Sequence, residues 1–370
     1  MEKLLYICKW DKEKRKTWSG TPYSLRESLM KYFEIVDCDI QLGFFKRVIA
    51  KLLSYHIYKG KIVSHSYIFN RYYMNQLRKK AKKAIKKFDG KYVLEIGDFY
   101  TDQNHIYSVY QDLSVGYLLH LQKNFPETYS YCGHVYPRKV LEKRNKYQIK
   151  FYENCDNIFV MGKWLENFLK QDYEKKVHYV GAGYNAGNRE QIEMPQKSRN
   201  KILFVGRDFE RKGGDIVLEA YELAKVFKPD LQLYIAGPTD LACTHGKLRE
   251  GGCVYFLGDV PNEKLGYYYN LCDVFCVPSR FEAFGIVFVE ALHFGLPVIA
   301  ANNFEMKEIV RDGENGLLLT SYNAEELSKL FLKIFDSEEI FAQAQKSEQL
   351  SKEYSWDVVA ERMFKKITER

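Results

Sequence analysis

The chain has 370 residues, of which 46% are hydrophobic and 28% charged, and it carries a formal net charge of +8. This length provides for two domains with separate cores, and no run approaches the roughly 20 apolar residues of a membrane span. The eight cysteines form no C-x-x-C pair and the eight histidines no H-E-x-x-H spacing, which disfavours a disulfide framework and a protein-bound metal. Composition therefore predicts a soluble globular protein, which we expect to stay in the cytoplasm.

The first half alternates short apolar runs with helical patterns, as in a parallel sheet that helices cover on both faces. The first run, at residues 4–8, is too short for a signal peptide and is predicted to be a strand. Strands are predicted at residues 4–8, 35–40, 92–96, 107–111, 158–161 and 177–180. We therefore expect one doubly wound domain over residues 1–188.

Asp37-Cys38-Asp39 ends the second of these strands and spells D-x-D. In metal-dependent transferases of another fold, this motif holds a nucleotide diphosphate through a divalent ion. Here the alternation of a strand places both acids on one solvated face. A solvated pair is therefore the favoured interpretation, and no metal is expected.

Residues 44–91 contain 14 lysines or arginines and one acid, Asp89, so the basic character of the chain belongs to one local surface. A helix is predicted at residues 71–88, with an apolar stripe between its lysines formed by Tyr73, Leu77, Ala81, Ala84 and Phe88. Such a helix lies on an anionic membrane surface or packs on its own domain. Nucleic acid is the third alternative, but no nucleic-acid module accompanies the patch. We expect a peripheral contact with the inner face of the cell membrane and no nucleic acid.

The glycines of residues 181–189 and the polar stretch 191–200 are typical of a linker. Their spacing is G-x-G-x-x-x-G and no amphipathic helix follows, which disfavours an NAD site. Beyond this linker, strands are predicted at residues 202–205, 231–236, 254–257, 274–277, 298–300 and 317–319. We expect a second α/β domain over residues 189–354. Residues 355–370 are predicted to form a helix, with Ser355 as N-cap, that packs across both domains.

The first strand of the second half runs into a charged glycine loop that contains Arg207 and Lys212. A loop from strand to helix with fixed cations is a common way for an α/β sheet to hold phosphate. Arg207 can clamp two oxygens with its planar fork, and Lys212 supplies a point charge. The loop is not a Walker motif, and a solvated charged turn is the alternative.

Two carboxylates, Glu282 and Glu290, flank the predicted start of an apolar helix at Gly285. Glu282 is placed beside unpaired helix-terminal amides, which bind phosphate, while a carboxylate accepts hydrogen bonds from a sugar diol. Helix capping is the alternative role for Glu282. A charged Glu290 within an apolar helix is hard to explain structurally. Both loops follow strands of one sheet, so we expect them to open onto the same crevice.

These segments resemble the motifs of the retaining glycosyltransferase family 4, glycosyl transferases group 1. The matching pieces are Gly206-Arg207 to Lys212-Gly213, Gly258-Asp259-Val260, and Pro278-Ser279 to Glu290-Ala291. The resemblance implies a GT-B fold, with two Rossmann-like doubly wound parallel-sheet domains facing a central cleft. It implies a metal-independent enzyme without a cofactor. Such an enzyme moves a sugar, with retention, from a nucleoside diphosphate sugar to a hydroxyl of a glycan or lipid-linked acceptor, as in cell-surface polysaccharide biosynthesis.

The resemblance also implies a role for each matching residue of the second half. Arg207 and Lys212 would neutralise the donor diphosphate, Glu290 would hold the ribose and Glu282 the transferred sugar. The backbone amides of Phe284, Gly285 and Ile286 would complete the phosphate and sugar contacts. The backbone near Val260 would lie at the edge of the base. Arg207, Lys212 and Glu282 are thereby the expected catalytic residues of this half.

The first half resembles the family more loosely. Gly20 follows the first strand, where similar enzymes have a glycine loop near the donor phosphates and the acceptor. A purely structural turn, with Thr21 as N-cap and Pro22 as first helical residue, is the alternative. Many relatives carry a histidine after the fourth strand, where this chain has Asp112 as a candidate catalytic base. The general base stays open, because His120 and His134 are also close in sequence.

Two other functions keep the same fold. A sugar-nucleotide epimerase or hydrolase would release a free sugar without any acceptor. A non-catalytic carbohydrate or membrane adaptor would lose the phosphate clamp, and the complete set of Arg207, Lys212, Glu282 and Glu290 disfavours it.

Overall fold

The computed structural model describes residues 1–58, 61–64, 67–132, 136–185, 199–238, 253–346 and 352–369. The chain forms two compact units, one of Met1–Gly183 with Trp356–Arg370 and one of Tyr184–Ser355. The first unit ends at Gly183, and the sequence predicted that the first domain ends at residue 188. Within the described residues, no helix has the length and apolar character that a membrane span requires.

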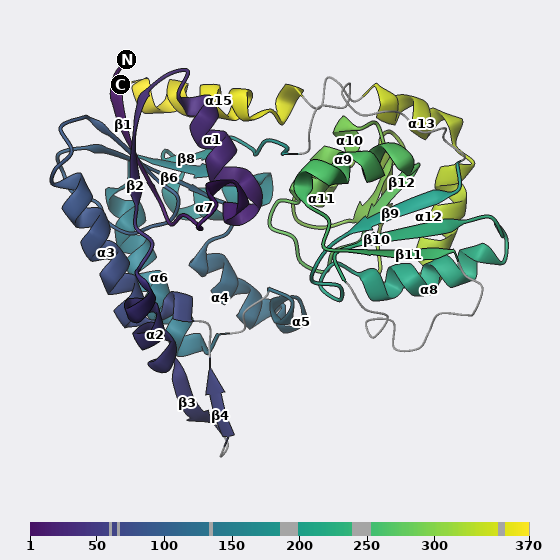
Figure 1. Cartoon of the computed structure of the whole chain (residues 1–370), viewed down its shortest axis with the longest axis horizontal. Helices are drawn as coiled ribbons and strands as arrows, with labels where there is room; N and C mark the ends of the chain where they lie inside the picture. Colours follow the sequence, from purple (N-terminus) through teal and green to yellow (C-terminus); the bar gives the residue numbers. More distant parts are fainter. Residues whose placement is uncertain are drawn as a thin grey trace. The chain divides into compact units, whose positions relative to one another are not determined.

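The first unit is built on a parallel six-stranded sheet with the order β2-β1-β5-β6-β7-β8 (Figure 1). Its strands are β1 (Lys3–Cys8), β2 (Glu34–Asp39), β5 (Tyr92–Glu95), β6 (Ile106–Gln111), β7 (Asn157–Val160) and β8 (Val177–Tyr179). These are the six strands that the sequence predicted. The apolar side chains of the inner strands β1, β5, β6 and β7 are almost fully buried, because helices cover both faces of the sheet, and those of the edge strand β2 are half-buried.

One face of this sheet packs against α2, α3, α6 and α7, and the other carries α1 and α15. The helical segments of the unit are η1 (Lys14–Gly20), α1 (Thr21–Leu29), α2 (Phe44–Leu52), η2 (Tyr67–Phe69), α3 (Arg71–Ile85), α4 (Val115–Asn124), α5 (Pro126–Ser130), α6 (Arg138–Asn154), α7 (Lys163–Tyr173) and α15 (Trp356–Thr368). Helix α1 has Gly20 as its N-cap, with a φ of 87°. The prediction of Thr21 as N-cap was therefore wrong by one residue.

The apolar stripe of α3 is part of the core of the first unit. Tyr73, Leu77, Ala81 and Ile85 are at most 2% exposed and pack against the sheet. Phe88 is half-buried against the same core. The interpretation of this stripe as a membrane-facing surface was therefore wrong. Its apolar side chains instead hold α3 on its own domain, and its lysines lie outside.

Two elements of the basic segment were not predicted from the sequence. Helix α2 follows β2, and a two-stranded antiparallel hairpin follows α2, formed by β3 (Tyr55–Tyr58) and β4 (Lys61–Ser64). Figure 1 shows the hairpin extending away from the sheet beyond α2. Of the residues of α2 itself, only Ala50 is fully buried, so the helix contacts the core through a small part of its surface.

The C-terminal helix α15 returns to the first unit. The Phe364 ring centre lies 4.8 Å from that of Tyr32 and 5.4 Å from that of Phe33, and Arg362 donates a 3.0 Å hydrogen bond to the Val180 carbonyl. The helix begins at Trp356, directly after Ser355, and the role of Ser355 as N-cap stays a prediction. Its predicted contact with the second domain stays a prediction.

The D-x-D acids of the first unit have protein partners. Arg26 Nε lies 2.9 Å from both carboxylate oxygens of Asp37, and Asp39 Oδ1 accepts hydrogen bonds from the backbone amides of Trp10 and Gln41. These bonds fix the ends of β1 and β2. Among the described residues, no three His, Cys, Asp or Glu side chains come together in a group that could hold a metal ion.

The second unit has a parallel six-stranded sheet with the order β11-β10-β9-β12-β13-β14. Its strands are β9 (Lys201–Val205), β10 (Gln232–Ala236), β11 (Val254–Gly258), β12 (Val274–Val277), β13 (Val298–Ala301) and β14 (Gly316–Leu319). All six were predicted from the sequence. The strand order reverses between β9 and β12, and such a reversal opens a crevice at the carboxyl ends of the strands.

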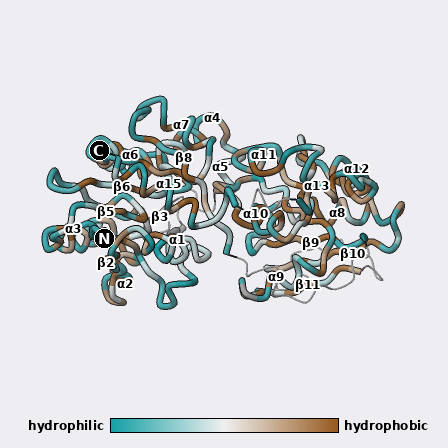
Figure 2. The backbone as a smooth tube through the Cα atoms, turned by 90° about the horizontal axis from the view of Figure 1, so that it is seen from above, coloured by the Kyte–Doolittle hydropathy of each residue, from teal (hydrophilic) through white to brown (hydrophobic). Residues whose placement is uncertain are grey.

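Helices cover both faces of this second sheet, with α8 and α12 on one side and α9, α10 and α11 on the other (Figure 1). The helices are α8 (Gly214–Lys225), α9 (Asn262–Leu271), α10 (Ile286–His293), α11 (Met306–Ile309), α12 (Ala324–Phe335) and α13 (Glu338–Gln345). Figure 2 colours α10 brown, in keeping with its burial between sheet and neighbouring helices. An apolar helix at this position places a polar site at its N-terminus on a rigid support.

Candidate functional site

The two charged loops of the second unit lie side by side at the reversal of strand order. Strands β9 and β12 are neighbours in the sheet, with Phe275 opposite Leu203. The loop of residues 206–213 follows β9, and the loop of residues 278–285 follows β12. A backbone hydrogen bond of 2.8 Å joins the Arg280 amide to the Arg211 carbonyl. The two loops that the sequence singled out are thus neighbours, and the crevice expected between them stays a prediction.

Lys212 and Glu282 form an ion pair at the centre of these loops. Lys212 Nζ donates a hydrogen bond to Glu282 Oε2, and their side chains are only 11% and 14% exposed. Ser279 Oγ lies 3.5 Å and Arg211 Nη1 3.8 Å from the same carboxylate oxygen. An ammonium group has three N–H donors, and a carboxylate accepts about four hydrogen bonds. The pair can therefore hold an anion and a hydroxyl group while its two members stay bound to each other.

Arg207 pairs with an acid from another predicted motif. Its Nε and Nη2 atoms each lie 2.8 Å from Asp259 Oδ1, and the two side chains are 80% and 63% exposed. This bond connects the loop after β9 to the Gly258-Asp259-Val260 segment that ends β11. Exposed pairs of this kind contribute about 0–1 kcal/mol, so the guanidinium group is readily available to an incoming anion.

Gly285 sets the position of Glu282 relative to α10. It is the N-cap of α10, with a φ of 89°, and a Cβ atom added to it would lie 2.4 Å from the Phe288 ring and 3.1 Å from Glu282 Cγ. Only glycine adopts this conformation without strain. The Phe-Gly turn thereby brings the Glu282 side chain against the first turn of the helix, as the sequence predicted.

Gly213 is a second position where the site depends on glycine. Its φ is 77°, and an added Cβ atom would lie 2.5 Å from the Pro278 carbonyl oxygen of the neighbouring loop. We expect Gly213→Ala to lower the unfolding free energy by more than about 2 kcal/mol, because backbone strain and a backbone clash add. Chemical denaturation measures this effect. Gly313→Ala is the matched control, since Gly313 has a φ of 79° and open space around it.

The Gly313→Ala variant is expected to lose only the strain of positive φ, on the order of 1 kcal/mol. Equal losses in the two variants would contradict the close approach of the two loops at Gly213.

Glu290 has protein partners for both carboxylate oxygens. It is 5% exposed within α10, Tyr269 Oη donates to its Oε2 at 3.2 Å, and the Asn185 amide donates to its Oε1 at 3.1 Å. Burial and then the nearby Glu290 charge raise the pKa of Tyr269, so the phenol stays a donor. The structure thus accounts for a carboxylate in an apolar helix, which the sequence left unexplained. Its expected contact with a ribose stays a prediction.

The other residues predicted to line the donor site belong to the same unit. Phe284 is buried and packs edge-on to Tyr354, with 6.1 Å between ring centres. Gly285 and Ile286 begin α10. Val260 is half-buried and directly follows the Arg207 partner Asp259. The expected contacts of Phe284, Gly285, Ile286 and Val260 with a donor stay predictions.

Gly20, Asp112 and His120 belong to the first unit. Gly20 is buried at the end of the loop after β1, and Asp112 is half-buried directly after β6, where it helps to raise the pKa of the buried Tyr110 after the larger effect of burial. His120 lies on α4 within an aromatic cluster, 5.6 Å from Tyr117 between ring centres. His134 lies outside the described residues. The roles of Gly20 and of a general base stay predictions.

Two further side chains of the site were missed in the sequence. Arg211 Nη1 donates to the Phe281 carbonyl at 3.0 Å, and its Nε donates to Asp208 at 2.9 Å. Arg280 forms a two-pronged ion pair with Asp215 at 2.7 and 2.6 Å, which ties the second loop to α8. Their position beside Lys212 and Glu282 in sequence was the available signal, but it does not distinguish a bracing arginine from a solvated one.

The sequence of the chain is similar to those of known proteins. Residues 188–353 match the family model described as "Glycosyl transferases group 1". The chain is 37% identical over 153 residues to an "Uncharacterized 41.2 kDa protein in cps region" of Klebsiella pneumoniae. The matched segment covers 41% of this chain and 40% of that protein. It is 31% identical over 175 residues to a phosphatidyl-myo-inositol mannosyltransferase of Mycolicibacterium smegmatis. That match covers 45% of this chain and 44% of the mannosyltransferase. The chain spans about half the length of the curated relatives it matches.

Solved structures resemble the chain over nearly its full length. Sucrose-phosphate synthase from Thermosynechococcus elongatus has a TM-score of 0.68 at 18% identity, with coverage of 98% of this chain and 97% of that one. Anabaena HepE, in complex with UDP and glucose, has a TM-score of 0.62 at 14% identity, with 100% of both chains covered. These likenesses confirm a GT-B fold with two Rossmann-like units.

Proposed function

Because residues 188–353 match the model of the group 1 glycosyltransferases, we propose that this protein moves a sugar from a nucleoside diphosphate sugar to a hydroxyl of a glycan or lipid-linked acceptor. We propose further that transfer proceeds with retention and without a metal ion, in the biosynthesis of a cell-surface polysaccharide. The pairing of Lys212 with Glu282 at the strand-order reversal carries this proposal. Lys212 provides a cation for the diphosphate, and Glu282 provides a carboxylate that accepts hydrogen bonds from sugar hydroxyls. The two groups are in direct contact.

Each charged group of the site has a chemical task in this proposal. Negative charge grows on the leaving diphosphate in the transition state, and fixed cations and helix-terminal amides stabilise it. Lys212 is positioned for this by its bond to Glu282, and Arg207 is exposed enough to reach an anion once it leaves Asp259. Glu282 would orient the transferred sugar, and Glu290 the ribose. Asp112 is the candidate base on the acceptor side.

Relatives and structural neighbours support the donor and acceptor classes. The mannosyltransferase relative is named for phosphatidyl-myo-inositol, a lipid-linked acceptor, and the HepE structure contains UDP and glucose. The Klebsiella relative is named for its place in a cps region. A hydrolase or epimerase on the same fold would yield free sugar instead, and analysis of products with and without acceptor separates these alternatives.

The donor site is tested by thermal stabilisation with a panel of nucleoside diphosphate sugars. A ligand present at 100 times its Kd stabilises the folded state by about 2.7 kcal/mol, which shifts the melting temperature measurably. Arg207→Ala is expected to weaken binding of the stabilising sugar nucleotide roughly tenfold or more, because a charge-assisted hydrogen bond to phosphate is lost. Glu290→Gln is expected to weaken it as well, since the carboxylate would lose its charge toward the ribose.

Arg311→Ala is the matched control, because Arg311 is an exposed arginine of the same unit that pairs with Glu314 across 3.8 Å. Wild-type behaviour of this control, together with weakened binding in both site variants, supports the donor site. If no sugar nucleotide stabilises the wild type, or if Arg207→Ala responds as the wild type does, the donor site is wrongly assigned.

We also propose that the first unit contacts an anionic membrane surface, now through α2 rather than α3. Phe44 and Phe45 are 66% and 81% exposed, and four further apolar residues on the same half of the helix are also exposed: Val48, Ile49, Leu52 and Leu53. The buried Ala50 lies on the opposite half. Lys46 and Lys51 are exposed beside the apolar half. An apolar face turned to solvent with flanking lysines is typical of a helix that lies in a membrane interface.

A further inference from the structure

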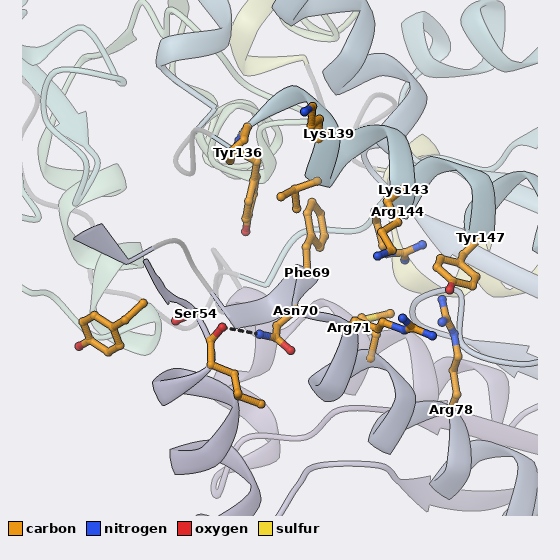
Figure 3. Close-up of a pocket in the computed structure, with 15 residues that line it drawn as sticks. Ser54, Phe69, Asn70, Arg71, Arg78, Tyr136, Lys139, Lys143, Arg144 and Tyr147 are labelled. Atoms are coloured by element: carbon orange, nitrogen blue, oxygen red, sulfur yellow. Dashed lines mark hydrogen bonds between the residues drawn. The ribbon is translucent and has the colours of Figure 1, made fainter. Parts of the chain in front are cut away.

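The first unit contains a cavity of about 480 Å³ between α3, α6 and the end of α2 (Figure 3). Its volume falls in the range of about 300–1,000 Å³ that is usual for small-molecule sites. Asn70 and Arg71 at the start of α3, Pro137 at the start of α6, and Leu53 after α2 all line it. None of these residues belongs to the glycosyl-transfer site described above.

Five cations line this cavity, and few acids neutralise them. They are Arg71, Arg78, Lys139, Lys143 and Arg144. In the described portion of the chain, the only one of the five with a carboxylate partner is Arg144, whose Nη2 donates to Asp98. The cavity therefore holds an excess of positive charge in a partly enclosed space, which favours an anionic occupant.

Two of the arginines lie against aromatic rings, and one of them, Arg144, has unused donors. Arg144 is 6% exposed, and its Nε and Nη1 atoms have no hydrogen-bond partner among the described residues. Its guanidinium group lies 5.7 Å from the centre of the Phe69 ring, and that of Arg78 lies 4.2 Å from the centre of the Tyr147 ring. Figure 3 shows Arg78 and Arg144 on the same side of the cavity as Tyr147. Buried donors without partners are costly, and an anion would satisfy them.

Like charges meet in this part of the cavity. Burial, and then the neighbouring Arg144 guanidinium, lower the pKa of Arg78. Two guanidinium groups that repel each other are both stabilised when one phosphate accepts hydrogen bonds from both.

Two helices direct their N-termini to the same space. Helix α3 begins at Arg71, and the 17-residue helix α6 begins at Arg138 with Pro137 as an N-cap that provides no side-chain hydrogen bond. Helix N-termini carry partial positive charge and bind phosphate groups. Together with the five side-chain cations, they make the cavity a site for a phosphate rather than for a neutral molecule.

The other lining is apolar and continuous with the exposed face of α2. Leu53 is 58% exposed, follows the last residue of α2, and lines the cavity together with Tyr55, Phe69 and Met74. A molecule with its phosphate among the arginines would thus extend along Leu53 to the apolar half of α2. A phosphate joined to hydrocarbon chains fits both surfaces, whereas a water-soluble phosphate leaves the apolar one uncovered.

We propose that this cavity binds the phosphate headgroup of one anionic membrane lipid, whose hydrocarbon chains lie along the exposed face of α2. Arg78 and Arg144 hold the phosphate, and Lys139 and Lys143 close the cavity toward solvent. The site is separate from glycosyl transfer and does not rest on it. Through this site the first unit binds one anionic lipid molecule specifically, and not only the negative charge of the membrane surface.

The probe is dihexanoyl phosphatidic acid below its micelle concentration, titrated calorimetrically into the full chain without any nucleotide. We expect it to bind at least about tenfold more tightly than dihexanoyl phosphatidylcholine, which has the same chains without net charge, and than glycerol 3-phosphate, which lacks the chains. Arg78→Gln is expected to weaken binding roughly tenfold. Lys139→Gln/Lys143→Gln is a second variant that leaves the buried Arg144–Asp98 pair intact.

The matched control is Lys146→Gln/Lys150→Gln, which removes two exposed lysines from α6 that do not line the cavity. Equal weakening in this control would overturn the site in favour of general surface charge. Equal affinity for glycerol 3-phosphate would overturn the lipid as occupant, and absence of binding would overturn the proposal altogether. Arg207→Ala is expected to bind the lipid as the wild type does, which separates this site from the donor site.

Discussion

Lys212→Gln is expected to lower kcat for glycosyl transfer, followed as release of the nucleoside diphosphate, by about 10²- to 10³-fold. The ammonium group is the buried cation of the site, and removal of one preorganised donor from a developing anion has effects of this size. Glutamine retains a hydrogen-bond donor toward Glu282, so the loop keeps its contact. The loss should fall on kcat more than on KM, because the charge on the diphosphate is greatest in the transition state.

Lys329→Gln on α12 is the matched control, since Lys329 is an exposed lysine of the same unit. The melting temperature of each variant shows whether the fold is retained. A Lys212→Gln enzyme with normal kcat, or one that loses activity only through unfolding, would contradict the placement of Lys212 at the leaving group. Such a result would leave the Lys212–Glu282 pair as a bond that merely joins two loops.

The double variant Phe44→Ser/Phe45→Ser is expected to reduce partition onto vesicles of phosphatidylcholine and phosphatidylglycerol by about 10²-fold or more. Full burial of one phenylalanine side chain contributes about 1.5–3 kcal/mol, and both rings of this pair are free to enter the interface. Sedimentation of the protein with vesicles measures the effect. The net charge is unchanged, so electrostatic attraction stays the same and the change reports the apolar face alone.

Val226→Ser/Phe227→Ser provides the comparison, because these two residues after α8 are 68% and 76% exposed on the second unit. It should partition as the wild type does. If both double variants lose binding equally, exposed apolar residues act without regard to position, and α2 is not a specific membrane contact. If the wild type binds vesicles of phosphatidylcholine alone as strongly as vesicles that also contain phosphatidylglycerol, the flanking lysines contribute little.

The regular elements were largely predictable from local pattern. Most sheet strands are short and largely apolar, and such runs between helical patterns indicate a parallel sheet covered on both faces. Gly285 and Gly213 marked the two turns of the site because positive φ excludes most other residues. The motif residues Arg207, Lys212, Glu282 and Glu290 were identified because their chemical types and spacing suit a diphosphate and sugar hydroxyls.

The errors arose where local pattern does not say which side of a helix faces the core. The stripe of α3 and the apolar face of α2 are alike in composition, but the first packs against the sheet and the second is exposed. A periodic apolar stripe normally indicates a buried face, and the amphipathic pattern of the short helix α2 gave no sign that its apolar side lies outside. The cavity beside α2 likewise depends on residues from α3 and α6 that are far apart in sequence.

The sequence by itself determined the strand positions and the glycine turns and indicated the charged residues of the proposed donor site, because these depend on neighbours within a few positions. Only the tertiary structure decided what each charge contacts. It paired Lys212 with Glu282, Arg207 with Asp259, and Glu290 with Tyr269. These partners are far apart in the chain, and the order of strands in the sheet brings them together. That order is a property of the whole fold, which no local pattern contains.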